Sequence, residues 1–111
     1  MNENFTIIPF GEYTAEQVSL VMEQDAHTSA KLAVNLNSRG SDSLTLTLSY
    51  ADGDDTPQLV VPLGTITSEG WTFFDVGPGL PINILVPDRF IVIATPNNSA
   101  PNTYGVFVTL Y

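Results

Sequence analysis

The acidic run Asp52-Gly53-Asp54-Asp55 is the stretch whose residue types most suggest chemistry. Calcium prefers several carboxylate and carbonyl oxygens as ligands, and a run of aspartates supplies them. The run lacks the spacing of an EF-hand loop and the bidentate Glu that ends one. Asp and Gly also favour hairpin turns, so we interpret the run as a solvated turn, with calcium binding as the alternative.

The single histidine, His27, is the other candidate for chemistry, and it lies beside Asp25 and Thr28 in a stretch typical of a turn. One His cannot build a multi-His metal site, and a catalytic triad needs a nucleophile that no motif identifies. Paired carboxylates could meet only in three dimensions, and nothing in the sequence marks such a pair. We expect a solvated loop histidine and a protein that is not an enzyme, with no catalytic residue, metal or cofactor.

Aromatic residues are the third group, and they suggest binding. Trp71 and Phe73 should share one face of a strand, with Phe74 on the other. Core packing is the simpler interpretation, but an exposed ring could stack on a sugar or anchor a protein partner. Apolar residues near the two termini could likewise pack in the core or contact a partner, and for these residues we favour contact between subunits. The candidate contact residues are Phe5, Ile7, Phe10, Tyr13, Trp71, Phe73 and Tyr111.

The stretch Ser43–Tyr50 indicates which elements position these groups. Leucines at every second position alternate with Ser and Thr, which predicts a β-strand with one apolar and one polar face. The acidic turn follows, and then the apolar run Leu59–Val61. A strand, a turn and a return strand indicate antiparallel β-structure.

Further short apolar runs between turn signals predict the other strands. They are Gln17–Glu23, Lys31–Asn37, Thr65–Thr67, Trp71–Val76, Ile82–Val86, Phe90–Thr95 and Tyr104–Tyr111. Gln17–Glu23 also fits a short helix, and we prefer a strand because the rest of the chain is β. Phe90–Ala94 is apolar on both faces, which predicts a central strand covered on both sides. This pattern predicts an all-β fold, a single antiparallel β-sandwich that is jelly-roll-like.

Residues 1–13 are expected to form an extended N-terminal arm that precedes a β-sandwich domain over residues 14–111. The arm is apolar and β-prone, but Pro9 and Gly11 interrupt a continuous ladder. Two interpretations remain open. The arm is either an edge strand of its own domain or an extension across a neighbouring subunit.

The charge balance narrows the choice of partners. The formal net charge is −9, from 12 acidic and 3 basic residues in a chain of 111. Three scattered cations cannot bind a phosphate backbone, so neither nucleic acid nor an anionic membrane is an expected partner. No apolar run approaches the ~18–20 residues of a membrane span, and the first residues lack a Sec-type signal. There is no cysteine. We expect a protein made in the cytoplasm that stays there or leaves inside an assembly.

The second half of the chain resembles the capsid decoration (cement) proteins of tailed double-stranded DNA phages. The likeness lies in DSLTLTLSYADGDDTPQLVVPLGTI and in LPINILVPDRFIVIATPNNSAPNTYGVFVTLY, about residues 42–111. These jelly-roll proteins also combine a Leu/Thr strand, an acidic turn, a Pro-Asp-Arg-type turn and a final strand that ends on an aromatic. The size and acidity are similar to those of the staple protein of epsilon-fifteen-like short-tailed phages.

The resemblance implies a structural virion protein on the outer capsid surface, where it bridges neighbouring coat subunits and stabilises the shell. Its partners would be the major capsid (coat) protein and further copies of itself, as a dimer or trimer. The alternative is a carbohydrate-binding β-sandwich module that uses the aromatic strand 71–74.

Overall fold

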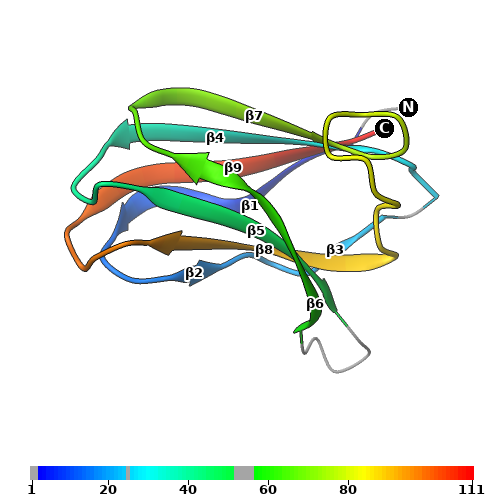
Figure 1. Ribbon diagram of the computed structural model, residues 1–111, viewed down its shortest axis with the longest axis horizontal. Helices are drawn as coiled ribbons and strands as arrows, with labels where there is room; N and C mark the ends of the chain where they lie inside the picture. Colours follow the sequence, from blue (N-terminus) through cyan, green and yellow to red (C-terminus); the bar gives the residue numbers. More distant parts are fainter. Residues whose placement is uncertain (1–2, 25, 52–56) are drawn as a thin grey trace.

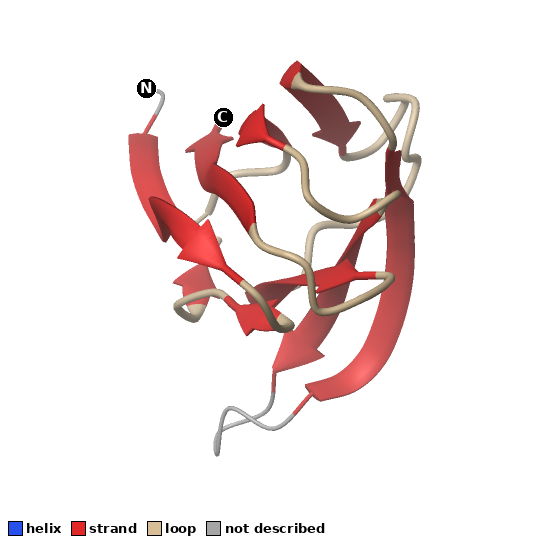
Figure 2. Cartoon of the chain, turned by 90° about the vertical axis from the view of Figure 1, so that its left-hand side faces the viewer, coloured by secondary structure: helices blue, strands red, loops and turns tan. Residues whose placement is uncertain are grey.

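The computed structural model describes residues 3–24, 26–51 and 57–111, and within them it contains strands, turns and loops but no helix (Figures 1 and 2). The predicted acidic turn at Asp52–Asp55 lies outside the described residues. The strands are β1 (Glu3–Tyr13), β2 (Gln17–Val18), β3 (Met22–Glu23), β4 (Ala30–Ser38), β5 (Leu44–Ala51), β6 (Pro57–Ile66), β7 (Gly70–Val76), β8 (Arg89–Pro96) and β9 (Asn102–Leu110).

Two antiparallel sheets face each other and form a β-sandwich, which confirms the predicted fold class. Sheet A has the order β1-β9-β4-β7, and sheet B has the order β2-β8-β5-β6, with β3 also paired to β8. Figure 1 shows β7, β4 and β9 across the top of the view, with β5, β8 and β2 below them. The sequence did not reveal whether β4 and β5 pair directly, and the structure places them in opposite sheets.

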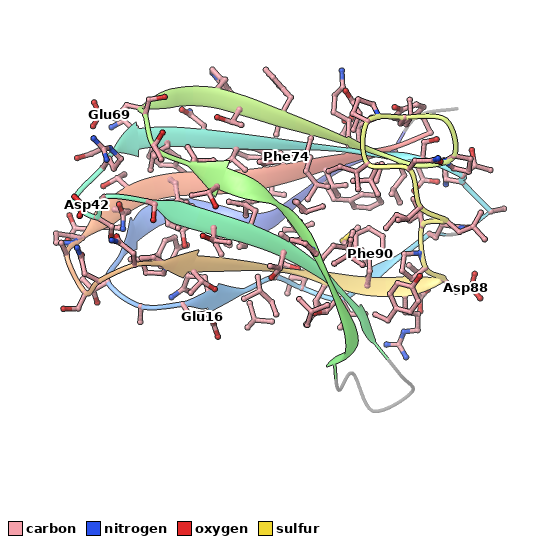
Figure 3. All side chains as sticks on the ribbon, viewed as in Figure 1. Glu16, Asp42, Glu69, Phe74, Asp88 and Phe90 are labelled. Atoms are coloured by element: carbon pink, nitrogen blue, oxygen red, sulfur yellow. The ribbon has the colours of Figure 1, made fainter. Side chains whose placement is uncertain are left out.

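The alternating pattern of β5 produces the predicted core. Leu44, Leu46 and Leu48 are fully buried between the sheets, while Thr45 and Thr47 point away from the core. β8 is an interior strand of sheet B, buried on both faces as expected. Figure 3 shows Phe74 and Phe90 in the space between the two sheets.

The N-terminal arm is the edge strand β1 of sheet A. It pairs with β9 from Glu3 opposite Leu110 to Tyr13 opposite Asn102, with two irregularities along the way. The first of these lies between Thr6 and Ile8, so that Ile7 and Ile8 are both buried in the core. Because β1 and β9 are antiparallel neighbours, the start of β1 and the end of β9 lie close together (Figure 2).

The predicted strand Gln17–Glu23 is interrupted. The backbone N–H of Val92 donates to the side-chain oxygen of Ser19 at 2.9 Å, and the N–H of Leu20 crosses to the carbonyl of Ile7 in β1 at 3.2 Å. Residues 19–21 therefore leave the ladder, and two short strands, β2 and β3, remain. The alternative of a helix is wrong.

The predicted strand Ile82–Val86 does not form, and this prediction is wrong. After β7 the chain turns back, and the N–H of Ile82 donates to the carbonyl of Asp75 at 3.0 Å. The segment pairs with β7 only through a single bridge between Ile82 and Val76. Ile84 still packs against the core and Leu85 is 75% exposed. The alternating apolar residues of this segment therefore reflect which side chains are buried, although the segment does not pair with a neighbouring strand. Thr65–Thr67, expected as a separate strand, instead supplies the end of β6 as far as Ile66.

A buried polar network joins two loops at one end of the sandwich. Asn102 is 1% exposed, and its Oδ1 accepts the backbone N–H groups of Gly40 and Ser41, each at 3.1 Å. Its Nδ2 donates to the Ser41 Oγ at 2.7 Å. Asp42 and Glu69 lie at this same end in Figure 3. The network fixes the β4–β5 loop against the β8–β9 loop.

Candidate interaction face

The outward side of sheet A carries the largest exposed aromatic groups of the described chain. The alternation of β7 sends Trp71 and Phe73 outward and Phe74 inward, as the sequence predicts. Trp71 is 56% and Phe73 57% exposed. Exposed rings that lie together form an apolar patch, which makes this side of sheet A the candidate interaction surface.

Phe107 of β9 extends this aromatic surface across β4. The Trp71 and Phe73 rings are nearly parallel, with centroids 6.0 Å apart and planes 6° apart. Phe107 of β9 lies on the other side of β4, with its ring centroid 5.9 Å from that of Trp71. The rings therefore form one connected group across three strands.

Phe10 of β1 adds a fourth ring, and Gly105 makes room for it. A Cβ on Gly105 would lie 3.1 Å from the Phe10 Cα and 3.1 Å from the Phe107 Cζ. A side chain at this position would push the Phe10 backbone or the Phe107 ring away by a few tenths of an ångström. Phe10 is 51% exposed. We call the group Phe10, Trp71, Phe73 and Phe107 the aromatic face.

Polar groups flank the aromatic face, but few are charged. Lys31 Nζ lies 5.9 Å from the Phe73 ring centroid and 3.8 Å from the Asp75 carboxylate. Asn35 of β4 is opposite Trp71 on one side and Gly105 on the other, and its side chain is half-buried. The arrangement offers flat rings, one amide and one exposed ion pair, which suits adhesion to another surface and supplies no reactive group.

The remaining candidate contact residues lie elsewhere. Ile7 is 1% exposed and belongs to the core, so it cannot contact a partner in the folded protein. Phe5, 37% exposed, lies at the edge where β1 faces β3, and Tyr111, 39% exposed, follows β9. Tyr13 packs on Tyr104, with ring centroids 5.2 Å apart, and its hydroxyl donates to the carbonyl of Pro9.

Phe107 is the member of the aromatic face that the sequence analysis missed. The signal was present, because Tyr104, Val106 and Val108 occupy alternate positions and therefore share one face of the last strand. Phe107 is out of phase with them and therefore points outward. Phe10 and Phe107 were far apart in the sequence, and only the pairing of β1 with β9 brings them together.

The titratable groups do not form a catalytic arrangement among the described residues. His27, expected to be solvated, has a side chain only 13% exposed, with Nδ1 2.9 Å from the Gln24 carbonyl oxygen and Nε2 4.0 Å from the Glu3 carboxylate. Burial, with a smaller contribution from Tyr13, raises the pKa of Tyr104 to about 12. Within residues 3–24, 26–51 and 57–111, no three His, Cys, Asp or Glu side chains are grouped to hold a metal ion, and no helix could cross a membrane.

No family model and no curated protein matches this chain. Several solved structures share its fold. The PBSX exported protein XepA matches with a TM-score of 0.61 at 13% identity, over 99% of this chain and 36% of that one. The SPBc2 prophage-derived protein YomS matches with a TM-score of 0.52 at 11% identity, over 97% and 93% of the two chains.

A viral protein has the same fold. The infectious bursal disease virus VP2 of a subviral particle matches with a TM-score of 0.59 at 10% identity, over 99% of this chain and 32% of that one. The chain thus spans about a third of XepA and of VP2 and nearly all of YomS. At these identities the likeness shows a shared fold.

Proposed function

We propose that this protein is a structural protein of a phage virion, which binds the outer surface of the capsid and bridges neighbouring coat subunits. The aromatic face is the observation that carries the proposal, because four rings gathered on one side of a sheet are typical of a protein-binding anchor. Support also comes from the fold, which this chain shares with two prophage proteins and with the VP2 of a virus particle.

The charge distribution fits attachment through the aromatic face. A net charge of −9 disfavours binding to any acidic surface. Beside the aromatic face, the positive charge of Lys31 offsets the negative charge of Asp75. The aromatic face can therefore approach a neutral or polar coat surface without strong repulsion. A dimer or trimer that engages two or more coat subunits at once would multiply modest contacts through effective concentration.

Co-sedimentation with expanded coat shells of the same phage system tests the proposal. We expect wild-type protein to pellet with the shells and to saturate at a ratio that matches lattice sites. Trp71→Ser with Phe73→Ser should weaken binding at least about tenfold, since truncating two anchors commonly costs more than 1.4 kcal/mol. Val60→Ser on sheet B, where Val60 is also 56% exposed, is the matched control. Wild-type protein that binds no shell would overturn the proposal.

Carbohydrate binding is the second candidate function. The nearly parallel Trp71 and Phe73 rings could stack on sugar rings, and the Asn35 amide beside them could pair with hydroxyl groups. Trp71 is the single tryptophan of the chain, so its fluorescence reports directly on this surface. A glycan array with no hits, together with Trp71 fluorescence that no sugar changes, would exclude this candidate.

A further inference from the structure

A groove lies between the two sheets at the edge where β1 faces β3, away from the aromatic face. Its volume is about 500 Å³. Phe5 and Thr6 of β1 line one wall, and Leu20, Val21 and Met22 line the other. We call this cavity the edge groove. Half of its lining residues are apolar and half are polar or charged, and it is open to solvent.

The edge groove begins where the chain turns from sheet B towards sheet A. Ser19 is still bonded to Val92 of β8, through its backbone N–H at 2.9 Å, but the N–H of the next residue, Leu20, donates to the Ile7 carbonyl of β1 at 3.2 Å. This bond ties the two sheets together beside the groove. Leu20 is left 66% exposed at the rim. The exposed surface of the Leu20 side chain can therefore contact a partner that enters the groove.

Both walls of the edge groove have a strand edge without a partner. Among the described strands, β1 pairs with β9 alone, and β3 pairs with β8 alone. The pairing of β1 is regular from Glu3 to Thr6, and its bulges and Pro9 come only after Thr6. Bulges and prolines commonly protect an edge strand, and this stretch contains neither, although Glu3 places one charge at its start. An open edge beside a groove with apolar side chains on both walls is the geometry of strand addition.

The charged groups at the mouth of the edge groove indicate which segment would fit. Glu3 and Glu23 both line the groove, with Arg89 as the cation, and the Arg89 Nε lies 3.9 Å from the Glu23 carboxylate. Two carboxylates face one guanidinium, in a chain of net charge −9. An acidic segment would be repelled, and an apolar segment with a Lys or Arg would be attracted.

We propose that the edge groove accepts an extended, apolar segment of a coat subunit that carries a basic residue, which pairs with the free edge of β1 between Glu3 and Thr6. This inference rests on the proposed virion function and supplies what that function requires. A bridging protein needs two attachment points, and the edge groove provides a second one, on a different side of the sandwich from the aromatic face.

Matched leucine variants test the inference in the shell co-sedimentation assay. Leu20→Glu adds a third carboxylate to the edge groove and removes an apolar contact, so shell binding should weaken at least tenfold. Leu85→Glu makes the same change at a leucine that is 75% exposed and outside the groove, and its binding should stay within twofold of wild type. Both leucines are exposed, so both variants should fold, which circular dichroism checks.

Cross-linking identifies the occupant. The chain has no cysteine, so Leu20→Cys can be labelled uniquely with a benzophenone maleimide before shells are added. We expect the label to cross-link one coat segment that is apolar and contains Lys or Arg, whereas labelled Leu85→Cys should not reach it. A cross-link to a second copy of this chain, or to no coat segment, would overturn the inference.

The two proposals fail in different ways. If Leu20→Glu binds shells as well as wild type while Trp71→Ser with Phe73→Ser does not, the edge-groove inference is wrong and the virion function stands. If wild-type protein binds no shell, the virion function and the edge-groove inference are both wrong.

Discussion

The Phe74 ring occupies the space that a side chain at Gly64 would need. A Cβ on Gly64 would lie 2.7 Å from the Phe74 Cε1, closer than real atoms approach. Gly64 belongs to β6 of sheet B and Phe74 to β7 of sheet A, so this contact closes the sandwich at the corner between the two sheets.

Gly64→Ala should therefore destabilise the fold by about 1–3 kcal/mol, because the Phe74 ring must shift in a packed core. Urea unfolding measures the change. Adding Phe74→Leu should recover part of the loss, and such coupling is the signature of direct contact. Thr67→Ala, at an exposed position just after β6, should change the free energy of unfolding by less than about 0.5 kcal/mol. Additive effects of the two substitutions would contradict the proposed contact.

Asn102→Ala should destabilise the protein by about 2–4 kcal/mol. The substitution leaves the buried N–H of Ser41 and the part-buried N–H of Gly40 without an acceptor, and an unsatisfied buried group costs about 1–3 kcal/mol. Asn97 is the control, because it accepts one N–H, from Ser43, at an exposed site at the same end. Asn97→Ala should cost clearly less in the same urea titration. Equal losses would mean that burial of the network contributes little.

Stability should fall between about pH 10 and pH 12 because of Tyr104. Its pKa is about 12 in the folded protein and about 10 in the unfolded chain, so the unfolded state loses its proton first as the pH rises. The unfolded state then binds fewer protons, which lowers the free energy of unfolding by up to about 2–3 kcal/mol across this window.

The Tyr104 hydroxyl is buried and has no hydrogen-bond partner among the described residues, so Tyr104→Phe should fold well at neutral pH. Urea midpoints at pH 9 and pH 11.5 should differ less in this variant than in wild type. An unchanged pH dependence would show that other groups cause the alkaline loss.

Removal of residues 1–10 should prevent folding. The deletion takes Ile7 and Ile8 from the core, at 1% and 2% exposure, and removes one of the two strands that pair with β9. Loss of one buried isoleucine side chain costs about 2–5 kcal/mol, against a typical domain stability of about 5–15 kcal/mol. Circular dichroism and amide dispersion in NMR spectra are the measurements. A folded protein with weakened shell binding would instead show that the arm is dispensable to the sandwich.

The sequence was sufficient to predict the fold class because apolar residues alternate with polar ones along its clearest strand. In β5 that alternation predicts one apolar face, and Leu44, Leu46 and Leu48 are buried there. Alternation reports burial and not pairing, which is why Ile82–Val86 was wrongly predicted as a strand. The pairing partner of a strand depends on chain segments far away in the sequence.

The aromatic face was only partly predictable for a similar reason. Trp71 and Phe73 lie two residues apart on one strand, so their common direction follows from strand geometry. Phe10 points outward because β1 changes register between Thr6 and Gly11. No pattern in the local sequence predicts that shift. The edge groove depends on where β1 and β3 diverge, which only the three-dimensional structure shows.

The pairing of Glu3 with Leu110 has a mechanical consequence. Because β1 and β9 are antiparallel neighbours, the two chain ends leave the sandwich at the same end. Tension applied through the ends would open the β1–β9 ladder rung by rung, like a zipper, and each rung would bear the load alone. A protein that resists pressure from inside a shell would instead have to take the load through its faces and edges, where many contacts share it.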